Sequence, residues 1–184
     1  MRFSCKTTND MLQKRVKRSK TPEQALASLQ RLCARAERSS GDALRLMATW
    51  EVEPAKRGEI LKKLLHDRFI DDSRYAAAFI REKSSLSAWG EYKIRAALRR
   101  KGISEEIISA TMSEQMPSNQ TERLTERLNR KVRSIKYDTT YQLKTKLLRY
   151  GLSLGFPMEQ VLESIEDVMR TIKQEEECND DTLF

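Results

Sequence analysis

The stretch AWGEYKIRAALRRKGISEEII, residues 88–108, decides how the rest of the chain is interpreted. Its first fourteen positions hold five Lys and Arg residues and one acid. On a helix of about 3.6 residues per turn over residues 90–101, Ile94, Ala97 and Leu98 share one face. The other face carries Tyr92, Lys93, Arg95, Arg99 and Arg100. The stretch therefore predicts an amphipathic helix with an apolar inner stripe and a cationic outer face.

The residues that follow predict where this helix ends and where the next one begins. Gly102 stands where a helix C-terminus commonly needs a residue in the left-handed conformation. Ser104 is a good N-cap, and the acids Glu105 and Glu106 suit the positive end of a helix dipole. We therefore interpret these two adjacent acids as capping residues and not as a catalytic pair.

Helical periodicity continues along almost the whole chain. The 184 residues include only 6 Gly and 4 Pro, and 34% are charged while 39% are hydrophobic. This profile favours a helical protein over a sheet protein or a disordered chain. Apolar residues follow Ile103 at five and nine positions, and they follow Phe156 at the same two spacings. We therefore expect an all-α protein, an elongated array of three tandem three-helix repeats.

The expected organisation has five segments, which are a basic N-terminal arm (1–20), a first repeat (21–70), a second repeat (71–117), a third repeat (118–173) and an acidic C-terminal tail (174–184). The first repeat fits the pattern least well. No apolar run approaches the roughly 18 residues that cross a bilayer, and the charged, polar N-terminal stretch lacks the apolar region of a secretory signal. We expect a soluble, cytoplasmic protein.

Positive charge is spread through the chain and is not confined to the arm. The net charge is +8, and the sequence pI is about 9.5. Residues 1–20 carry +6 and residues 171–184 carry −4, which leaves +6 in the body. The segment 121–150 alone holds nine Lys and Arg residues against three acids. Polyanions are therefore plausible partners.

Motifs for catalysis and for metal binding are missing from the sequence. Cys5, Cys33 and Cys178 are scattered, and His66 is the only histidine. We therefore expect reduced thiols, no metal and no cofactor. The sequence contains neither a glycine-rich nucleotide-binding loop nor a nucleophile elbow, so an enzyme is not expected.

The cationic helix alone leaves its role open. An ordinary solvated surface is the favoured interpretation when this helix is considered by itself. The alternatives are a surface that follows a phosphate backbone and one that docks on an acidic protein surface. Trp50 and Trp89 stand at junctions between elements, and we interpret both as packing anchors and not as base-stacking platforms.

Two neighbouring segments, FIDDSRYAAAFIREK (69–83) and WGEYKIRAALRRKGISEEIISATM (89–112), together resemble the RecX family of bacterial regulators of the RecA recombinase. The positions that carry the resemblance are Asp71, Asp72, Arg74, Tyr75, Ala76, Phe79, Gly90, Lys93, Ile94, Leu98, Lys101, Gly102 and Ile103. Weaker similarity extends over about residues 21–170. Ser153 and Leu154 depart from the basic residues that the family tends to place before Gly-Phe, and the arm and the tail lie outside the resemblance.

The resemblance implies three tandem three-helix repeats and a regulatory mechanism. Such proteins bind the active RecA filament on single-stranded DNA and suppress its ATP hydrolysis, strand exchange and co-protease activity, without an active site of their own. Direct contact with single-stranded DNA, and weak contact with duplex DNA, stay open. A monomer that does not bind membranes is expected, because no large apolar stripe is left unclaimed.

We expect twelve residues to contact the partner, and they are Arg74, Tyr92, Lys93, Arg95, Arg99, Arg100, Lys101, Arg130, Lys131, Lys144, Lys146 and Arg149. Charge reversal at Lys93, Arg95, Arg99 and Arg100 is expected to preserve the fold, because these residues face away from the apolar stripe. Two alternatives remain, which are a helix-turn-helix-like module that acts directly on DNA and a passive helical scaffold.

Overall fold

The computed structural model describes the backbone of residues 19–180 and the side chains of residues 19–174. Residues 1–18 of the predicted arm and residues 181–184 of the predicted acidic tail lie outside the described residues, and only the backbone is described for residues 175–180. Within residues 19–180 every regular element is a helix, as predicted. The helices are α1 (Pro22–Cys33), α2 (Ser40–Thr49), α3 (Pro54–His66), α4 (Asp72–Ser85), α5 (Glu91–Arg100), α6 (Glu105–Gln115), α7 (Gln120–Val132), α8 (Thr140–Leu154) and α9 (Met158–Asp180). None of these helices is long and apolar enough to span a bilayer.

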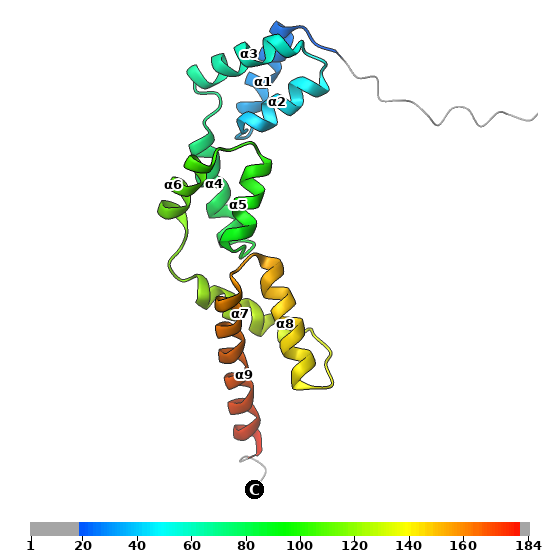
Figure 1. Cartoon of the computed structure of the whole chain (residues 1–184), viewed down its shortest axis with the longest axis vertical. Helices are drawn as coiled ribbons and strands as arrows, with labels where there is room; N and C mark the ends of the chain where they lie inside the picture. The colour runs from blue at the N-terminus through cyan, green and yellow to red at the C-terminus, as the bar shows by residue number, and fades with distance from the viewer. Residues whose placement is uncertain (1–18, 181–184) are drawn as a thin grey trace, which may run out of the picture. The chain divides into compact units, whose positions relative to one another are not determined.

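The first three helices form a compact unit that ends at Asp71. Thr21 and Gln24 form a capping box at the start of α1, where Pro22 occupies the first turn and needs no hydrogen-bond acceptor. Both α1 and α2 pack against α3 (Figure 1). The buried core of this unit consists of Ala25, Leu29, Ala43, Met47, Val52, Ile60, Leu64 and Ile70.

The remaining helices form a second unit, which begins at Asp72 and contains two three-helix groups. In the first group α4 packs mainly on α6, and in the second α7 packs on α9 (Figure 1). The core of the α4–α6 group consists of Ala76, Ile80, Ile94, Leu98, Ile103, Ile108 and Met112. The core of the α7–α9 group consists of Leu124, Leu128, Leu143, Leu147, Leu154, Phe156, Val161, Ile165, Val168 and Met169. The prediction of three-helix repeats is confirmed.

The same turn joins the second helix to the third helix in all three groups. A residue with positive φ is followed by a buried apolar residue, and the pairs are Glu51 and Val52, Gly102 and Ile103, and Gly155 and Phe156. In the first two groups the N–H of the buried residue donates to the carbonyl five residues earlier, at 3.0 and 3.2 Å. This hydrogen bond is typical of a Schellman helix end. The turn therefore ends one helix and at the same time inserts an apolar residue into the core of its group.

Two further helix ends have clear caps. Helix α2 ends at Thr49, and Trp50 is its C-cap. Thr139 is the N-cap of α8, because its side-chain oxygen accepts a hydrogen bond from the Gln142 N–H at 3.2 Å.

The C-terminus of α8 docks on the N-terminus of α5. The Gly90 N–H donates to the Leu154 carbonyl at 2.8 Å, and the Tyr92 N–H donates to the Gly155 carbonyl at 3.1 Å. The first N–H groups and the last carbonyls of a helix have no partner within the helix, so each helix end satisfies the other. The contact also brings the negative end of one helix dipole to the positive end of the other. We call this contact the α5–α8 junction.

Cationic side chains bind further helix-terminal carbonyls in the same unit. The donor and carbonyl pairs are Lys93 with Ser153 at 2.9 Å, Arg123 with Ser85 at 3.0 Å, and Arg127 with Leu86 at 2.9 Å. The C-terminus of α4 is thus capped by two arginines of α7. Positive charge near a helix C-terminus is favourable, because the carbonyls there carry partial negative charge.

The close approach at the α5–α8 junction requires glycine. A Cβ on Gly90 would lie 2.4 Å from the Gly155 carbonyl oxygen, and one on Gly155 would lie 2.4 Å from the Lys93 Cβ. Gly90 has an ordinary φ of −78°, so glycine is needed at this position only because of the close contact with α8. Gly155 has a φ of +88°, so contact and backbone conformation both disfavour a side chain there.

We predict that Gly90→Ala lowers the free energy of unfolding of the α4–α9 unit by about 1–3 kcal/mol. The added methyl group would collide with backbone atoms, which cannot rotate away as a flexible side chain could. Urea denaturation followed by circular dichroism at a helical wavelength measures the change.

Gly58→Ala is the matched control for this substitution. Gly58 lies inside α3, and a Cβ there has nothing within 4 Å. Alanine in a helix interior is more favourable than glycine by about 0.5–1 kcal/mol, so the control should gain stability. Equal stability of Gly90→Ala and the unchanged chain would show that the junction does not depend on close approach.

Candidate functional site

The structure confirms the amphipathic character of α5. Ile94 and Leu98 are fully buried, and Ala97 is nearly so. On the opposite face the Tyr92 side chain is 62% exposed. The Lys and Arg residues of that face, however, differ in the hydrogen bonds and ion pairs that they form within the chain.

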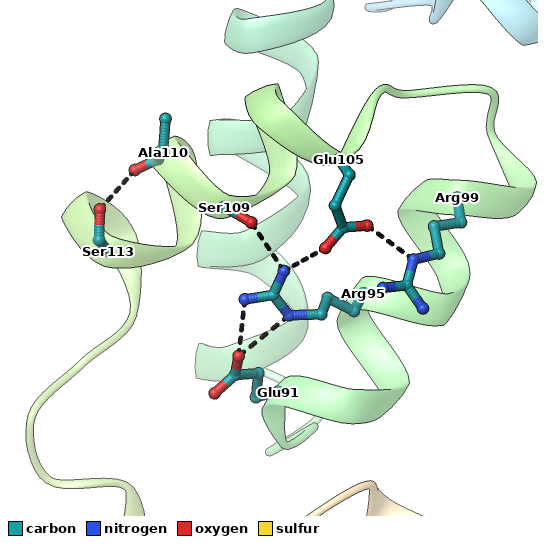
Figure 2. A network of polar contacts seen from close by, with 7 residues as sticks. All are labelled: Glu91, Arg95, Arg99, Glu105, Ser109, Ala110 and Ser113. Carbon is teal, nitrogen blue, oxygen red and sulfur yellow. Dashed lines mark hydrogen bonds and ion pairs between the residues drawn. The ribbon is translucent and has the colours of Figure 1, made fainter.

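Arg95 lies at the centre of a polar network between α5 and α6, and its side chain is half-buried (Figure 2). Its Nε and Nη2 donate to one carboxylate oxygen of Glu91, at 3.0 and 2.9 Å. Its Nη1 donates to Glu105 Oε1 at 2.5 Å and to Ser109 Oγ at 3.0 Å. The guanidinium therefore binds the start of α5 to the start of α6 and is largely occupied within the chain.

Glu105 bridges two arginines of α5. One of its carboxylate oxygens accepts from Arg95, and the other accepts from Arg99 Nε at 2.7 Å (Figure 2). The hydrogen bond from Arg99 is the main reason that the pKa of Glu105 is lowered, and the bond from Arg95 adds to it. Reciprocally, the bond to Glu91 raises the pKa of Arg95. Sequence reasoning assigned Glu105 only a capping role and missed this bridge.

Lys93 is also engaged within the chain. Its ammonium donates to the Ser153 carbonyl, as described above, and lies 4.7 Å from the centre of the Trp89 ring. Trp89 itself packs edge-on against Phe79, with the two ring centres 6.3 Å apart. This geometry agrees with the interpretation of Trp89 as a packing anchor.

These contacts correct one expectation about α5. Charge reversal at Lys93, Arg95, Arg99 and Arg100 was expected to preserve the fold because the side chains face away from the apolar stripe. They do face away from it, but Arg95 and Lys93 hold α5 to α6 and to α8, respectively. An acid at position 95 would face Glu91 and Glu105, so a fourfold reversal would remove structural contacts.

Three predicted cations of the α7–α9 group are likewise engaged. The contacts are Arg130 with Glu126 at 3.3 Å, Lys131 over the Tyr150 ring at 5.4 Å, and Lys146 Nζ with the Lys136 carbonyl at 2.6 Å. Arg130 and Lys146 are exposed, so the energetic weight of their contacts is small.

Lys144 and Arg149 are exposed on α8 and, among the described residues, form no hydrogen bond or ion pair. Both are therefore available to a partner. Arg74 on α4 and Arg100 near the end of α5 are exposed, and Lys101 is the half-buried C-cap of α5. The α5–α8 junction brings the C-terminus of α8 and the N-terminus of α5 together, so these two basic helices adjoin.

Within the described residues, no three His, Cys, Asp or Glu side chains gather where they could hold a metal ion. Cys33 is half-buried and is not part of a disulfide bond. Cys5 and the side chain of Cys178 lie outside the described residues. The twelve predicted partner contacts remain a prediction about binding.

Comparison with known proteins gives one consistent match. The family described as RecX, second three-helix domain, matches residues 71–112, the segment that contains α4, α5 and most of α6. A protein named Regulatory protein RecX from Bacillus cytotoxicus is 33% identical over 129 residues, which cover 68% of this chain and 48% of that protein. The protein of the same name from Bacillus mycoides is 30% identical over the same coverage. The chain thus spans about half the length of the curated relatives it matches.

Two crystal structures share the arrangement of helices. RecX from Lactobacillus salivarius aligns with a TM-score of 0.69 over 80% of this chain and 96% of that chain, and its 18% identity supports the fold alone. A regulatory protein RecX aligns with a TM-score of 0.69 at 26% identity, over 79% of this chain and 73% of that one. The family match, the curated relatives and the shared fold agree, and the chain belongs to the RecX family.

Proposed function

We propose that this chain is a non-enzymatic regulator that binds the RecA filament on single-stranded DNA and inhibits its ATPase, strand-exchange and co-protease activities. The observation that carries the proposal is the family match over residues 71–112, the segment that contains the basic helix α5. The name shared by its relatives, regulatory protein, supports the same role. We further propose that it acts as a monomer in the cytoplasm.

The structure favours a particular part of the predicted contact set. Lys144 and Arg149 offer exposed cations that no described acid neutralises, and Tyr92 offers an exposed ring on the adjoining helix. Cations that follow a surface neutralise phosphates, and an aromatic ring among them can stack on a base. We therefore assign direct contact with the filament to these three residues first. Lys93 and Arg95 support this surface by holding α5 in place.

A helix-turn-helix-like module that reads duplex DNA is the alternative. Such a module inserts a helix into the major groove and reads base edges with Asn, Gln or unengaged Arg. The outer face of α5 has no Asn or Gln, and its central Arg95 is occupied by Glu91 and Glu105. These features disfavour sequence-specific readout and favour contact with a backbone or an acidic surface.

We predict that Lys144→Glu combined with Arg149→Glu weakens inhibition of the cognate RecA's DNA-dependent ATPase by about tenfold, which corresponds to about 1.4 kcal/mol. The unfolding midpoint should stay unchanged, because both side chains are exposed and unpaired within the described residues. Titration of each variant into RecA on single-stranded DNA measures the inhibitory concentration.

Lys62→Glu with Lys63→Glu, on exposed positions of α3, is the matched control, because it changes the net charge by the same amount. If both double variants inhibit as well as the unchanged chain, α8 is not a contact surface. If both lose inhibition equally, only the net charge matters, and the assignment to α8 fails.

We also predict that Arg95→Ala lowers the free energy of unfolding by about 1 kcal/mol at neutral pH, since two carboxylates lose their shared partner. The pKa of Glu105 is lowered in the folded chain, so its ionised form stabilises the fold above the ordinary carboxyl pKa of 4.5. That stability is lost as the pH falls through the folded pKa. The difference between Arg95→Ala and the unchanged chain should therefore shrink in acid.

Chemical denaturation at pH 7 and at about pH 3 measures this difference. Arg149→Ala is the control, because the Arg149 side chain has no described carboxylate partner. The stability of this variant should equal that of the unchanged chain at both pH values. A stability loss for Arg95→Ala that is equally large in acid would contradict the ion-pair explanation.

A further inference from the structure

The first three-helix unit contains a basic cavity whose residues are not among the twelve predicted contact residues. The cavity has a volume of about 310 Å³ and opens to solvent. Its walls are formed by Lys20, Ser28, Arg31, Leu32, Arg35 and Trp50. Three of these six residues are cations, and no acid is among them. The cavity therefore gathers positive charge at a solvent-accessible hollow of the surface.

The two arginines of the cavity reinforce each other's charge. Arg31 lies in the last turn of α1, Arg35 follows the C-cap Ala34, and both line the cavity. Both side chains are exposed, and neither forms an ion pair within the described residues. Arg31 Nε donates to the carbonyl of Ala27 at 3.2 Å, which leaves the outer nitrogens of its guanidinium available.

Lys20 is fixed at the wall of the cavity before any ligand arrives. Its backbone N–H donates to the Trp50 carbonyl at 3.0 Å, and its ammonium donates to Ser28 Oγ at 2.8 Å. The ammonium also lies 3.6 Å from the centre of the Trp50 ring. Burial, and then repulsion by Arg31, lower the pKa of Lys20. A bound anion would relieve that repulsion, so the cavity favours a negatively charged ligand.

Trp50 has a second role that the sequence did not predict. It packs against the core of the first unit, in agreement with its interpretation as a packing anchor. It also forms a wall of the cavity, next to the cations. A groove that combines cations with an aromatic side chain is the usual arrangement for single-stranded nucleic acid.

We propose that this cavity binds a backbone phosphate of a single-stranded nucleic acid, with Arg31 and Arg35 as the principal ligands and Lys20 as a preplaced third cation. A guanidinium matches the geometry of phosphate oxygens and stays charged at all physiological pH values. The sequence KRVKRSK, residues 14–20, ends at Lys20 itself. Because a residue that lines the cavity stands at the end of a basic run in the sequence, an extended polyanion is favoured over a small isolated anion. The aromatic wall favours nucleic acid over an acidic peptide.

The test measures binding of a fluorescently labelled oligothymidylate of about 20 nucleotides to the full chain, by anisotropy, at several salt concentrations. No RecA is present, so the result is independent of the filament-binding proposal. Arg31→Ala with Arg35→Ala should weaken binding several-fold. It should also reduce the slope of log affinity against log salt by about 0.7, the value for one lost phosphate contact on a single strand.

Lys62→Ala with Lys63→Ala removes the same charge from exposed positions of the same unit and should leave the slope unchanged. Circular dichroism verifies that both double variants are folded. Equal slopes for the arginine variant and the unchanged chain would overturn the proposal.

Competition with polyglutamate and with inorganic phosphate identifies the ligand class. Polyglutamate should displace the oligonucleotide only weakly, and phosphate only at high concentration. If polyglutamate competes as well as unlabelled oligothymidylate, and only when Arg31 and Arg35 are present, the cavity binds acidic peptides, and the nucleic-acid assignment is wrong.

Discussion

The hydrogen bonds between the last carbonyls of α8 and the first N–H groups of α5 are the contact on which the second unit depends. Each helix end has backbone groups without a partner, and burial of such groups would be costly if they were not bonded. Gly90 and Gly155 allow the two backbones to approach closely enough to bond directly. Because Tyr92 and Lys93 belong to the same turn, the junction also positions the start of the basic helix.

The need of helix-terminal carbonyls for hydrogen-bond donors also determines which Lys and Arg side chains remain available to a partner. Helix-terminal carbonyls of α4 and α8 bind Arg123, Arg127 and Lys93, so these charges serve the fold. The Glu105 bridge occupies Arg95 and part of Arg99. A count of Lys and Arg along a basic helix therefore overstates the charge that it offers to a polyanion. Lys144 and Arg149 of α8 are exposed and stay available to a partner.

Local features were predictable from the sequence, and long-range contacts were not. The buried Ile94 and Leu98 and the left-handed Gly102 follow from periodicity and glycine chemistry, which act within one or two turns. The left-handed Glu51 has no such signal, because that conformation is usually marked by Gly or Asn. Lys93 and Ser153 are 60 residues apart, so only the packing of α8 on α5 brings them together. The roles of the predicted site residues depend on contacts of this kind. The sequence therefore located α5 but did not show which of its Lys and Arg side chains are engaged within the chain.

The two units differ in whether acidic side chains accompany their clustered Lys and Arg residues. Between α5 and α6, each of two arginines has a carboxylate, so the network stabilises the folded chain without a ligand. Around Trp50, three cations share a cavity with no acid in its wall, and Arg31 repels Lys20. The chain has 27 Asp and Glu residues, and none of them is among the residues that line this cavity. A cluster that stays unneutralised, with one lysine held rigidly by Ser28 and Trp50, is best explained by a ligand that supplies the missing negative charge. Arg31 and Arg35 are close in the sequence, but only the fold shows that Lys20 and Trp50 line the same cavity.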